Sequence, residues 1–147
     1  MNRLNRKVEY ALMALKVIGQ KHQGERTSAK EVADLTGSPF DATARVMQQM
    51  AQKEILRSEQ GAHGGYQLVR DLSKISMFEL MEIVLGPIAV AKCQQHESDC
   101  DLVGSCNIMS PLSVLNRKLT EFYRAVSVGE LLKTPASPRR QDLGVAK

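Results

Sequence analysis

The spacing of apolar residues changes once along this chain of 147 residues, from a helical period to an alternating one. Before the change, apolar residues at three- and four-residue steps predict helices over about residues 5–21, 28–37 and 38–53. After it, residues 55–59 and 66–69 alternate, and the glycine-rich stretch between them predicts a hairpin. Three helices followed by a hairpin is the order of a winged helix-turn-helix domain. We therefore expect a mainly α fold with a two-stranded wing.

The second half of the chain predicts further helices. Ser76 and Glu79 have the spacing of a capping box and open a helix that ends at Gly86. The same spacing begins the earlier helix at Ser28 with Glu31 and a last short helix at Ser127 with Glu130. Ser110 then starts a long helix, and a short helix through Leu131 follows it. The apolar residues of the long helix follow a heptad-like seam that predicts packing on a second subunit, and hence a homodimer: Leu112, Leu115, Leu119, Phe122 and Val126.

These patterns divide the chain into four parts. Residues 1–87 form the winged helix-turn-helix region and residues 88–109 a loop that holds all the cysteines. Residues 110–133 form the dimerisation helix and the short terminal helix. Residues 134–147 contain prolines, paired arginines and few apolar side chains, so we expect a disordered tail.

Positive charge is concentrated in the first half of the chain. Residues 1–74 contain 12 Lys or Arg and 8 Asp or Glu, whereas residues 75–147 contain 8 of each. This excess is compatible with phosphate binding. The apolar stretches are too short to cross a membrane, and Lys16 interrupts the apolar run near the start, so we expect a cytoplasmic protein with no leader peptide. We find no nucleophile-and-base set, so we do not expect an enzyme.

We expect the helix over residues 38–53 to begin with Ser38 as its cap and to bury Thr43, Val46, Met47 and Met50. Its polar side chains then face outward: Asp41, Arg45, Gln48, Gln49 and Gln52.

This helix over residues 38–53 is the one that a helix-turn-helix places in the major groove of double-stranded DNA. Arg45 there can pair with guanine and Gln48 with adenine. An ordinary solvated helix face, or a module that docks another protein, is the alternative interpretation. The candidate DNA contacts on this helix, the helix before it, the first helix and the hairpin loop are Arg6, Lys7, Ser28, Ser38, Phe40, Asp41, Arg45, Gln48, His63 and Gly64.

The three cysteines, Cys93, Cys100 and Cys106, lie close together in a polar segment that contains no Lys or Arg. Their C-x6-C-x5-C spacing lacks the tight pairs of structural zinc sites, whereas iron–sulfur clusters tolerate wider loops. The spacing therefore favours a cluster over a zinc site or three inert thiols. A fourth ligand is needed, and His96 is the imidazole available in the segment.

Taken together, several motifs resemble the Rrf-type winged-helix regulators, a family that includes IscR, NsrR and RirA. The likeness extends over about residues 3–133. The matching pieces are Leu4 with Lys7, Tyr10-Ala11-Leu12, the helix-turn-helix, the wing sequence at 61–68, the three cysteines and Gly129-Glu130-Leu131. The resemblance implies a bacterial homodimeric transcription factor that binds a palindromic operator. It also implies that Cys93, Cys100 and Cys106 hold a 2Fe-2S or 4Fe-4S cluster whose state, set by nitric oxide, redox conditions or iron–sulfur supply, controls DNA affinity.

Two positions depart from the family pattern, and a third matches one member of the family. Met109 stands where IscR has its histidine ligand, and Gln60 stands where the wing usually carries arginine. Glu9, just before Tyr10, matches the carboxylate that completes the site in NsrR. Our hypothesis is that Glu9 reaches the cluster of the other subunit, with His96 as the second choice. A thiol or zinc sensor on the same scaffold is the rival hypothesis.

Overall fold

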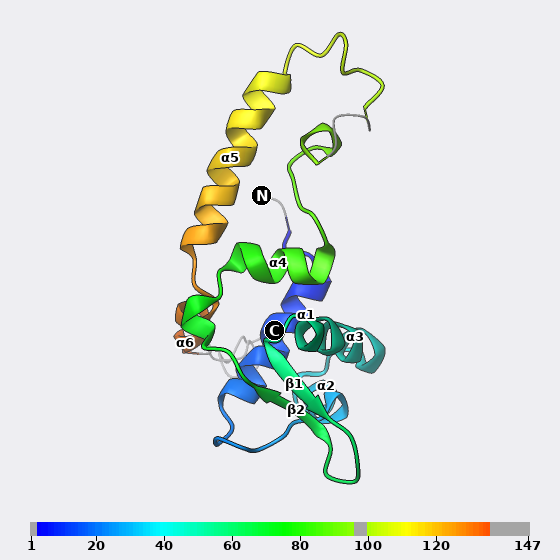
Figure 1. Cartoon of the computed structure of the whole chain (residues 1–147), viewed down its shortest axis with the longest axis vertical. Coiled ribbons are helices and arrows are strands. Elements are labelled where there is room, and N and C mark those ends of the chain that lie inside the picture. The colour runs from blue at the N-terminus through cyan, green and yellow to red at the C-terminus, as the bar shows by residue number, and fades with distance from the viewer. Residues whose placement is uncertain (1–2, 96–99, 136–147) are drawn as a thin grey trace, which may run out of the picture.

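The computed structural model describes residues 3–95 and 100–135, and it confirms a mainly helical fold with a two-stranded antiparallel sheet (Figure 1). The first elements in order are α1 (Arg6–Gly19), α2 (Ala29–Thr36), α3 (Phe40–Gln52), β1 (Leu56–Glu59) and β2 (Gly65–Leu68). They are followed by η1 (Leu72–Lys74), α4 (Met77–Leu85), η2 (Lys92–Gln94), α5 (Met109–Ala125) and α6 (Val128–Lys133). The predicted tail, apart from its first residues, lies outside the described residues.

The core lies where α1 packs against α2, α3, α4 and β2. Helix α1 contributes Leu15, α3 contributes Met47 and α4 contributes Leu80, none of which is exposed to solvent. The buried face predicted for α3 is confirmed at each of its four positions: Thr43, Val46, Met47 and Met50. We call α1 to α4, with the hairpin β1–β2, the head.

Serine residues begin three of the helices, as their capping-box spacing predicts. In each case the serine hydroxyl accepts a hydrogen bond from the backbone N–H of the glutamate three residues later, which satisfies a donor that the helix cannot pair. The pairs are Ser28 with Glu31, Ser76 with Glu79, and Ser127 with Glu130. The prediction that Ser38 caps the third helix, with Pro39 at its first position, is wrong, because α3 begins at Phe40 and its N-cap is Pro39.

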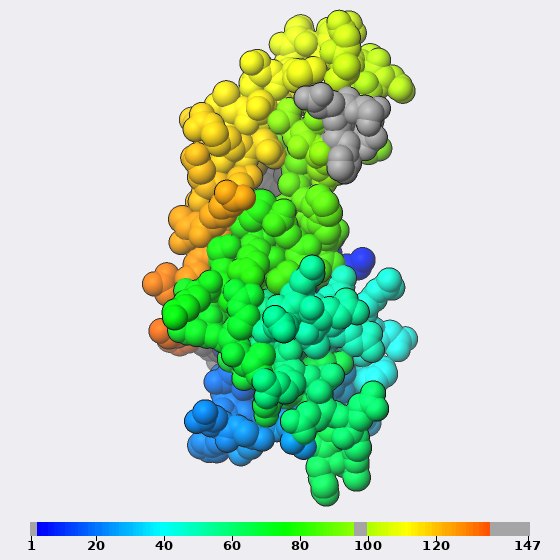
Figure 2. Space-filling view, viewed as in Figure 1, coloured from blue at the N-terminus to red at the C-terminus, as the bar shows by residue number. Residues whose placement is uncertain are grey.

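Helix α5 and the segment that precedes it project from the head, at the end of the molecule furthest from the hairpin (Figure 2). Residues 88–108, between α4 and α5, are called the cysteine arm. All of α5 is described, and none of its residues is buried. Within the described residues no helix is both long and apolar enough to cross a membrane.

The chain returns to the head after α5. The backbone N–H of Met77 donates to the carbonyl of Val126 at 2.8 Å, and that of Val128 donates to the carbonyl of Ile75 at 2.8 Å. Helix α6 then packs on η1 so closely that a Cβ on Gly129 would lie 2.6 Å from the backbone nitrogen of Ser73. The C-terminal end of α5 is therefore held against the start of α4.

Candidate DNA interface and cysteine segment

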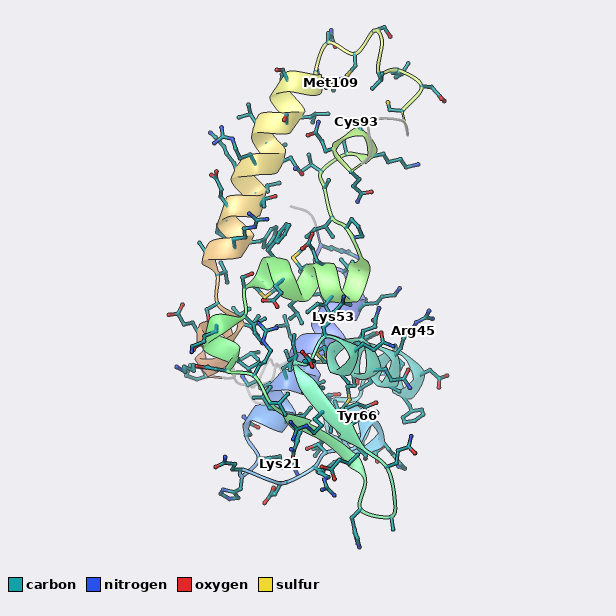
Figure 3. The ribbon with its side chains drawn as sticks, in the orientation of Figure 1. Lys21, Arg45, Lys53, Tyr66, Cys93 and Met109 are labelled. Atoms are coloured by element: carbon teal, nitrogen blue, oxygen red, sulfur yellow. The ribbon has the colours of Figure 1, made fainter. Side chains whose placement is uncertain are left out.

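The exposed face of α3 carries the side chains predicted to meet DNA. Asp41, Arg45 and Gln48 are exposed, and in Figure 3 Arg45 points away from the body of the head. Phe40, the first residue of α3, is 52% exposed. An exposed phenyl ring at this point can make apolar contact with a thymine methyl group in the major groove.

Ser38 is the predicted contact that the structure does not expose. Its hydroxyl lies 2.8 Å from the hydroxyl of Thr36 and 2.7 Å from that of Thr43, and the Thr43 hydroxyl donates to the Pro39 carbonyl at 2.9 Å. This chain of hydroxyl groups ties the end of α2 to the start of α3. Because the Ser38 side chain is buried and its hydroxyl is occupied, it sets the angle of α3 rather than offering a group to DNA.

Gln49 also differs from the expectation that it faces solvent. It is half-buried, and its amide nitrogen donates to the carbonyl of Val84 in α4 at 3.3 Å. Its other amide atom, Oε1, is buried with no hydrogen-bond partner among the described residues. The helical period alone places Gln49 near the edge of the exposed face, and the neighbouring α4 then covers it.

A groove of about 430 Å³ separates the hairpin from α2 and α3. Ser28 and Gln48 line its helical side, and Glu59 and Gly64 line its hairpin side. The structure therefore brings together three of the predicted DNA contacts, Ser28, Gln48 and Gly64. Ser28 also serves as the N-cap of α2, which places the N-terminus of that helix at the groove.

The tip of the hairpin needs glycine at position 64. A Cβ there would lie 2.5 Å from the carbonyl oxygen of Glu59 and 2.9 Å from that of Gly61, which is closer than a side chain can approach. His63 is exposed at this tip, as predicted, and its carbonyl accepts a hydrogen bond from Arg26 at 3.2 Å. The Arg26 guanidinium also forms an ion pair with Glu59. Sequence reasoning missed Arg26, because no local pattern shows that it lies against the hairpin.

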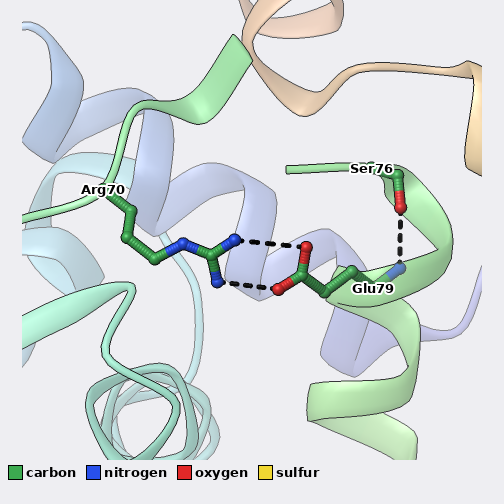
Figure 4. Close-up of polar contacts among 3 residues, drawn as sticks. All are labelled: Arg70, Ser76 and Glu79. Atoms are coloured by element: carbon green, nitrogen blue, oxygen red, sulfur yellow. Dashed lines mark hydrogen bonds and ion pairs between the residues drawn. The ribbon is translucent and has the colours of Figure 1, made fainter. Parts of the chain in front are cut away.

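The hairpin is joined to α4 by a second ion pair (Figure 4). Arg70 follows β2, and its guanidinium makes two contacts with the Glu79 carboxylate, at 2.7 and 3.4 Å. The hydrogen bond with Glu79 raises the pKa of Arg70, against a smaller lowering from burial, so Arg70 stays charged. Burial raises the pKa of Tyr66 on β2 above the ordinary value of a tyrosine phenol, because a phenolate there would be poorly solvated.

The start of α1 holds two predicted phosphate contacts and one predicted metal ligand. Arg6 and Lys7 are exposed, and the Arg6 guanidinium lies 2.8 Å from the carboxylate of Glu9. The structure thus places Arg6 and Glu9 together as an ion pair within one subunit. A Glu9 carboxylate that binds a metal has to leave this pair or share it.

The three cysteines are free thiols, and each is half-buried (Cys93 is labelled in Figure 3). Their donor chemistry fits an iron–sulfur cluster, since three thiols are available and the segment that holds them contains no Lys or Arg. The geometry of one subunit does not assemble the site: among the described residues no three Cys, His, Asp or Glu side chains come together. His96, the second choice for a fourth ligand, lies outside the described residues.

The predicted dimer seam on α5 is divided. Leu115, Leu119 and Phe122 are 46%, 37% and 59% exposed. Leu112 and Val126 are half-buried, and Val126 packs on the core of the head. The middle of the seam is thus a continuous apolar strip that this subunit leaves open to solvent.

A winged helix-turn-helix that exposes its recognition helix, here α3, is the arrangement with which many transcriptional regulators read the major groove of DNA. Comparison with known proteins agrees: the family model named Rrf2, described as an iron-dependent transcriptional regulator, matches residues 4–134. The chain belongs to the Rrf2 family of transcriptional regulators.

Relatives by sequence include the protein aau3 of Rhizobium meliloti, which is 26% identical over 133 residues, covering 89% of this chain and 85% of that protein. The regulator IscR of Xenorhabdus nematophila is 24% identical over 131 residues, covering 89% of this chain and 79% of that protein.

Solved structures share the fold at lower identity. CymR, the global cysteine regulator of B. subtilis, superposes with a TM-score of 0.68 at 18% identity, over 92% of this chain and all of that one. IscR of T. potens superposes with a TM-score of 0.65 at 17% identity, over 93% of this chain and 94% of that one. These similarities confirm the winged-helix fold predicted from the sequence.

Proposed function

We propose that this regulator is a homodimer whose affinity for a palindromic operator depends on an iron–sulfur cluster held by Cys93, Cys100 and Cys106. The observation that carries the proposal is the presence of three free, half-buried thiols in the short arm between the head and α5. The sequence relatives named IscR and the iron-dependent description of the family support it.

The cysteine arm is well placed to influence the head. The backbone N–H of Val90 donates to the side chain of Asn116 in α5 at 3.1 Å, so the first part of the arm is attached to that helix. The far end of α5 is held against α4 through Val126 and Met77. Helix α4 in turn contacts α3 through Gln49. These contacts form a continuous path from the arm to α3, the recognition helix. A change in the arm can therefore reach that helix.

In a dimer these contacts decide the spacing of two recognition helices. Half-sites of an operator lie one helical turn apart or a multiple of it, so a small rotation of α5 against its partner changes the match to DNA. Cys93, Cys100 and Cys106 would hold the cluster, which would supply a centre sensitive to nitric oxide, oxygen or loss of iron. Without it these three side chains would lose a common anchor, and the arm would be free to relax. By linkage, operator DNA must stabilise the form of the arm that binds DNA more tightly.

Glu9 is the proposed fourth ligand, supplied by the partner subunit. It lies in the first turn of α1, and its side chain is 32% exposed. Within its own subunit Glu9 forms an ion pair with Arg6. Among the described residues it does not belong to a group of metal ligands with the cysteines. A ligand from the partner would complete a site that one subunit leaves open.

Anaerobic purification tests this function. We expect a brown protein with visible absorption and with iron and acid-labile sulfide in proportion to subunits. Glu9→Ala should shift the absorption spectrum or lower the iron content, whereas the matched control Glu82→Ala, on the exposed side of α4, should change neither. An iron-free, colourless wild-type protein would contradict the cluster, and unchanged spectra in Glu9→Ala would contradict only the fourth ligand.

A thiol sensor is the second candidate function. It is favoured by the free state of the three thiols, which are not gathered into a ligand group among the described residues. Solved structures with this fold include Staphylococcus aureus CymR in an oxidized form. If this candidate is correct, iron-free protein should change its DNA affinity on mild oxidation and recover with a dithiol reductant. A zinc sensor would instead contain stoichiometric zinc and lose its DNA response with a chelator.

A further inference from the structure

The hairpin loop lines a DNA-facing groove but contains no cation of its own. Residues 60–65 include neither Lys nor Arg. Glu59, the residue just before this loop, is acidic and lines the groove together with Gln48. A carboxylate at this position repels DNA phosphate unless a positive charge lies next to it.

Arg26 provides that charge from another part of the chain. It lies between α1 and α2, and its guanidinium pairs with the Glu59 carboxylate and donates to the His63 carbonyl at 3.2 Å. The two side chains are still partly open to water, at 35% for Arg26 and 39% for Glu59. A guanidinium has five N–H donors, so these two contacts leave donors free for an oxygen of DNA.

The backbone fixes Arg26 at the edge of the hairpin. The next residue, Thr27, forms two backbone hydrogen bonds with Tyr66 of β2, each 2.9 Å long. A Cβ on Gly65 would lie 3.3 Å from the Cβ of Arg26, so the two segments are in close contact. Ser28 then caps α2 at the groove. Arg26 therefore lies on a short, well-held segment between two DNA-facing elements.

We propose that Arg26 is the phosphate-binding residue of the wing, and that Glu59 competes with DNA for its guanidinium. In the free protein Glu59 neutralises Arg26, and in the complex a backbone phosphate oxygen takes over part of that contact. The inference rests on the DNA-binding function of the family and concerns which residue carries the contact. It also assigns Glu59 a restraining effect on affinity.

The test measures DNA affinity against salt concentration for the full chain. The probe is a short duplex selected by the wild-type protein from random-sequence DNA, and fluorescence anisotropy gives the dissociation constant. Arg26→Gln should weaken binding about tenfold and reduce the slope of log affinity against log salt by about 0.9 for each subunit bound. Glu59→Gln should strengthen binding, because it frees the guanidinium. Arg57→Gln, which removes one exposed positive charge from the same hairpin, should keep the wild-type slope.

Whether Glu59→Gln strengthens or weakens DNA binding shows whether Arg26 contacts DNA or only holds the hairpin in shape. If Arg26 only holds the hairpin in shape, breaking the pair from either side weakens binding by the same factor and leaves the salt slope unchanged. That result would overturn the proposal. Wild-type affinity in Arg26→Gln would also overturn it while leaving DNA binding intact, whereas failure of the wild type to select any duplex would overturn DNA binding itself. If Arg26→Gln does not fold, the DNA affinity of Glu59→Gln is decisive by itself: stronger binding supports the proposal and weaker binding overturns it.

Discussion

The head and the cysteine arm differ in what holds them in place. The head has a core in which Leu15, Met47 and Leu80 are fully buried. The described residues of the arm and α5 contain no comparable core: Leu102 is 66% exposed, and no residue of α5 is buried. The chain's own core therefore holds the head in place, whereas the described residues of the arm and α5 expose apolar side chains, which our proposal assigns to contact with a second subunit or a bound group. This division suits a sensor, because the part that detects a signal must be able to change while the part that binds DNA keeps its shape.

Two leucines, one in the head and one in the arm, should respond differently to truncation. Leu80→Ala removes a side chain that fills the core between α4 and α1, and it should lower the free energy of unfolding by about 2–5 kcal/mol. Leu102→Ala removes the same atoms from an exposed side chain of the arm, and it should change the free energy of unfolding by less than about 0.5 kcal/mol. Urea unfolding followed by circular dichroism measures both. Equal losses would mean that the arm has a core of its own.

The second prediction concerns the open apolar strip of α5. Leu119→Ala should raise the dimer dissociation constant by at least about tenfold, because each subunit would lose part of the roughly 1.5–3 kcal/mol gained by burying a leucine. Leu131→Ala, in α6 and similarly exposed, is the control and should leave the constant unchanged. Sedimentation equilibrium gives the measurement. If both variants remain dimers of wild-type affinity, the subunit interface lies elsewhere.

Sequence patterns predicted the features that depend on neighbours in the chain. Capping pairs such as Ser76 with Glu79 are three residues apart, and the structure contains each of the three that open helices in this way. The buried face of α3 follows from helical periodicity in the same manner. The two strands and the glycine-rich loop between them are also local.

The missed features depend on residues that are distant in the sequence. Gln49 turns inward because Val84, 35 residues later, offers a carbonyl, and Arg26 meets the carbonyl of His63 37 residues away. Ser38 is buried because the end of α2 and the start of α3 close over its hydroxyl. The proposed cysteine site is harder still, since the described residues of the single chain do not bring the three thiols together.

The third prediction concerns the turn between α2 and α3, where Ser38 lies. Ser38→Ala breaks the hydroxyl chain between Thr36 and Thr43 and should cost about 1–2 kcal/mol of unfolding free energy. Ser58→Ala, at an exposed position on β1, should cost little. The two variants are compared by urea unfolding. If Ser38→Ala is as stable as wild type but loses DNA affinity, the hydroxyl contacts DNA after all, and our structural assignment is wrong.

The fourth prediction has the smallest expected effect and concerns pH. Hydrogen bonds from the side chain and the backbone N–H of Ser73 lower the pKa of Asp71 below its ordinary value of 3.8. A lowered pKa means that the folded state favours the carboxylate, so the stabilisation is present above pH 3.8 and is lost as the pH falls through the lowered value. Asp71→Asn should be slightly less stable than wild type at neutral pH and should approach it in acid. Asp41→Asn serves as the control, and a stability difference that persists at the lowest pH would contradict the assignment.

If the state of the cysteine arm controls the head, DNA affinity must depend on the bound iron. Affinity for the selected duplex is therefore measured on anaerobically purified wild-type protein and on the same sample after its iron is removed. We predict a change of at least about tenfold. Cys100→Ser should contain little iron, and its affinity should not respond to the treatment. Identical affinities for iron-loaded and iron-free wild-type protein would contradict the claim.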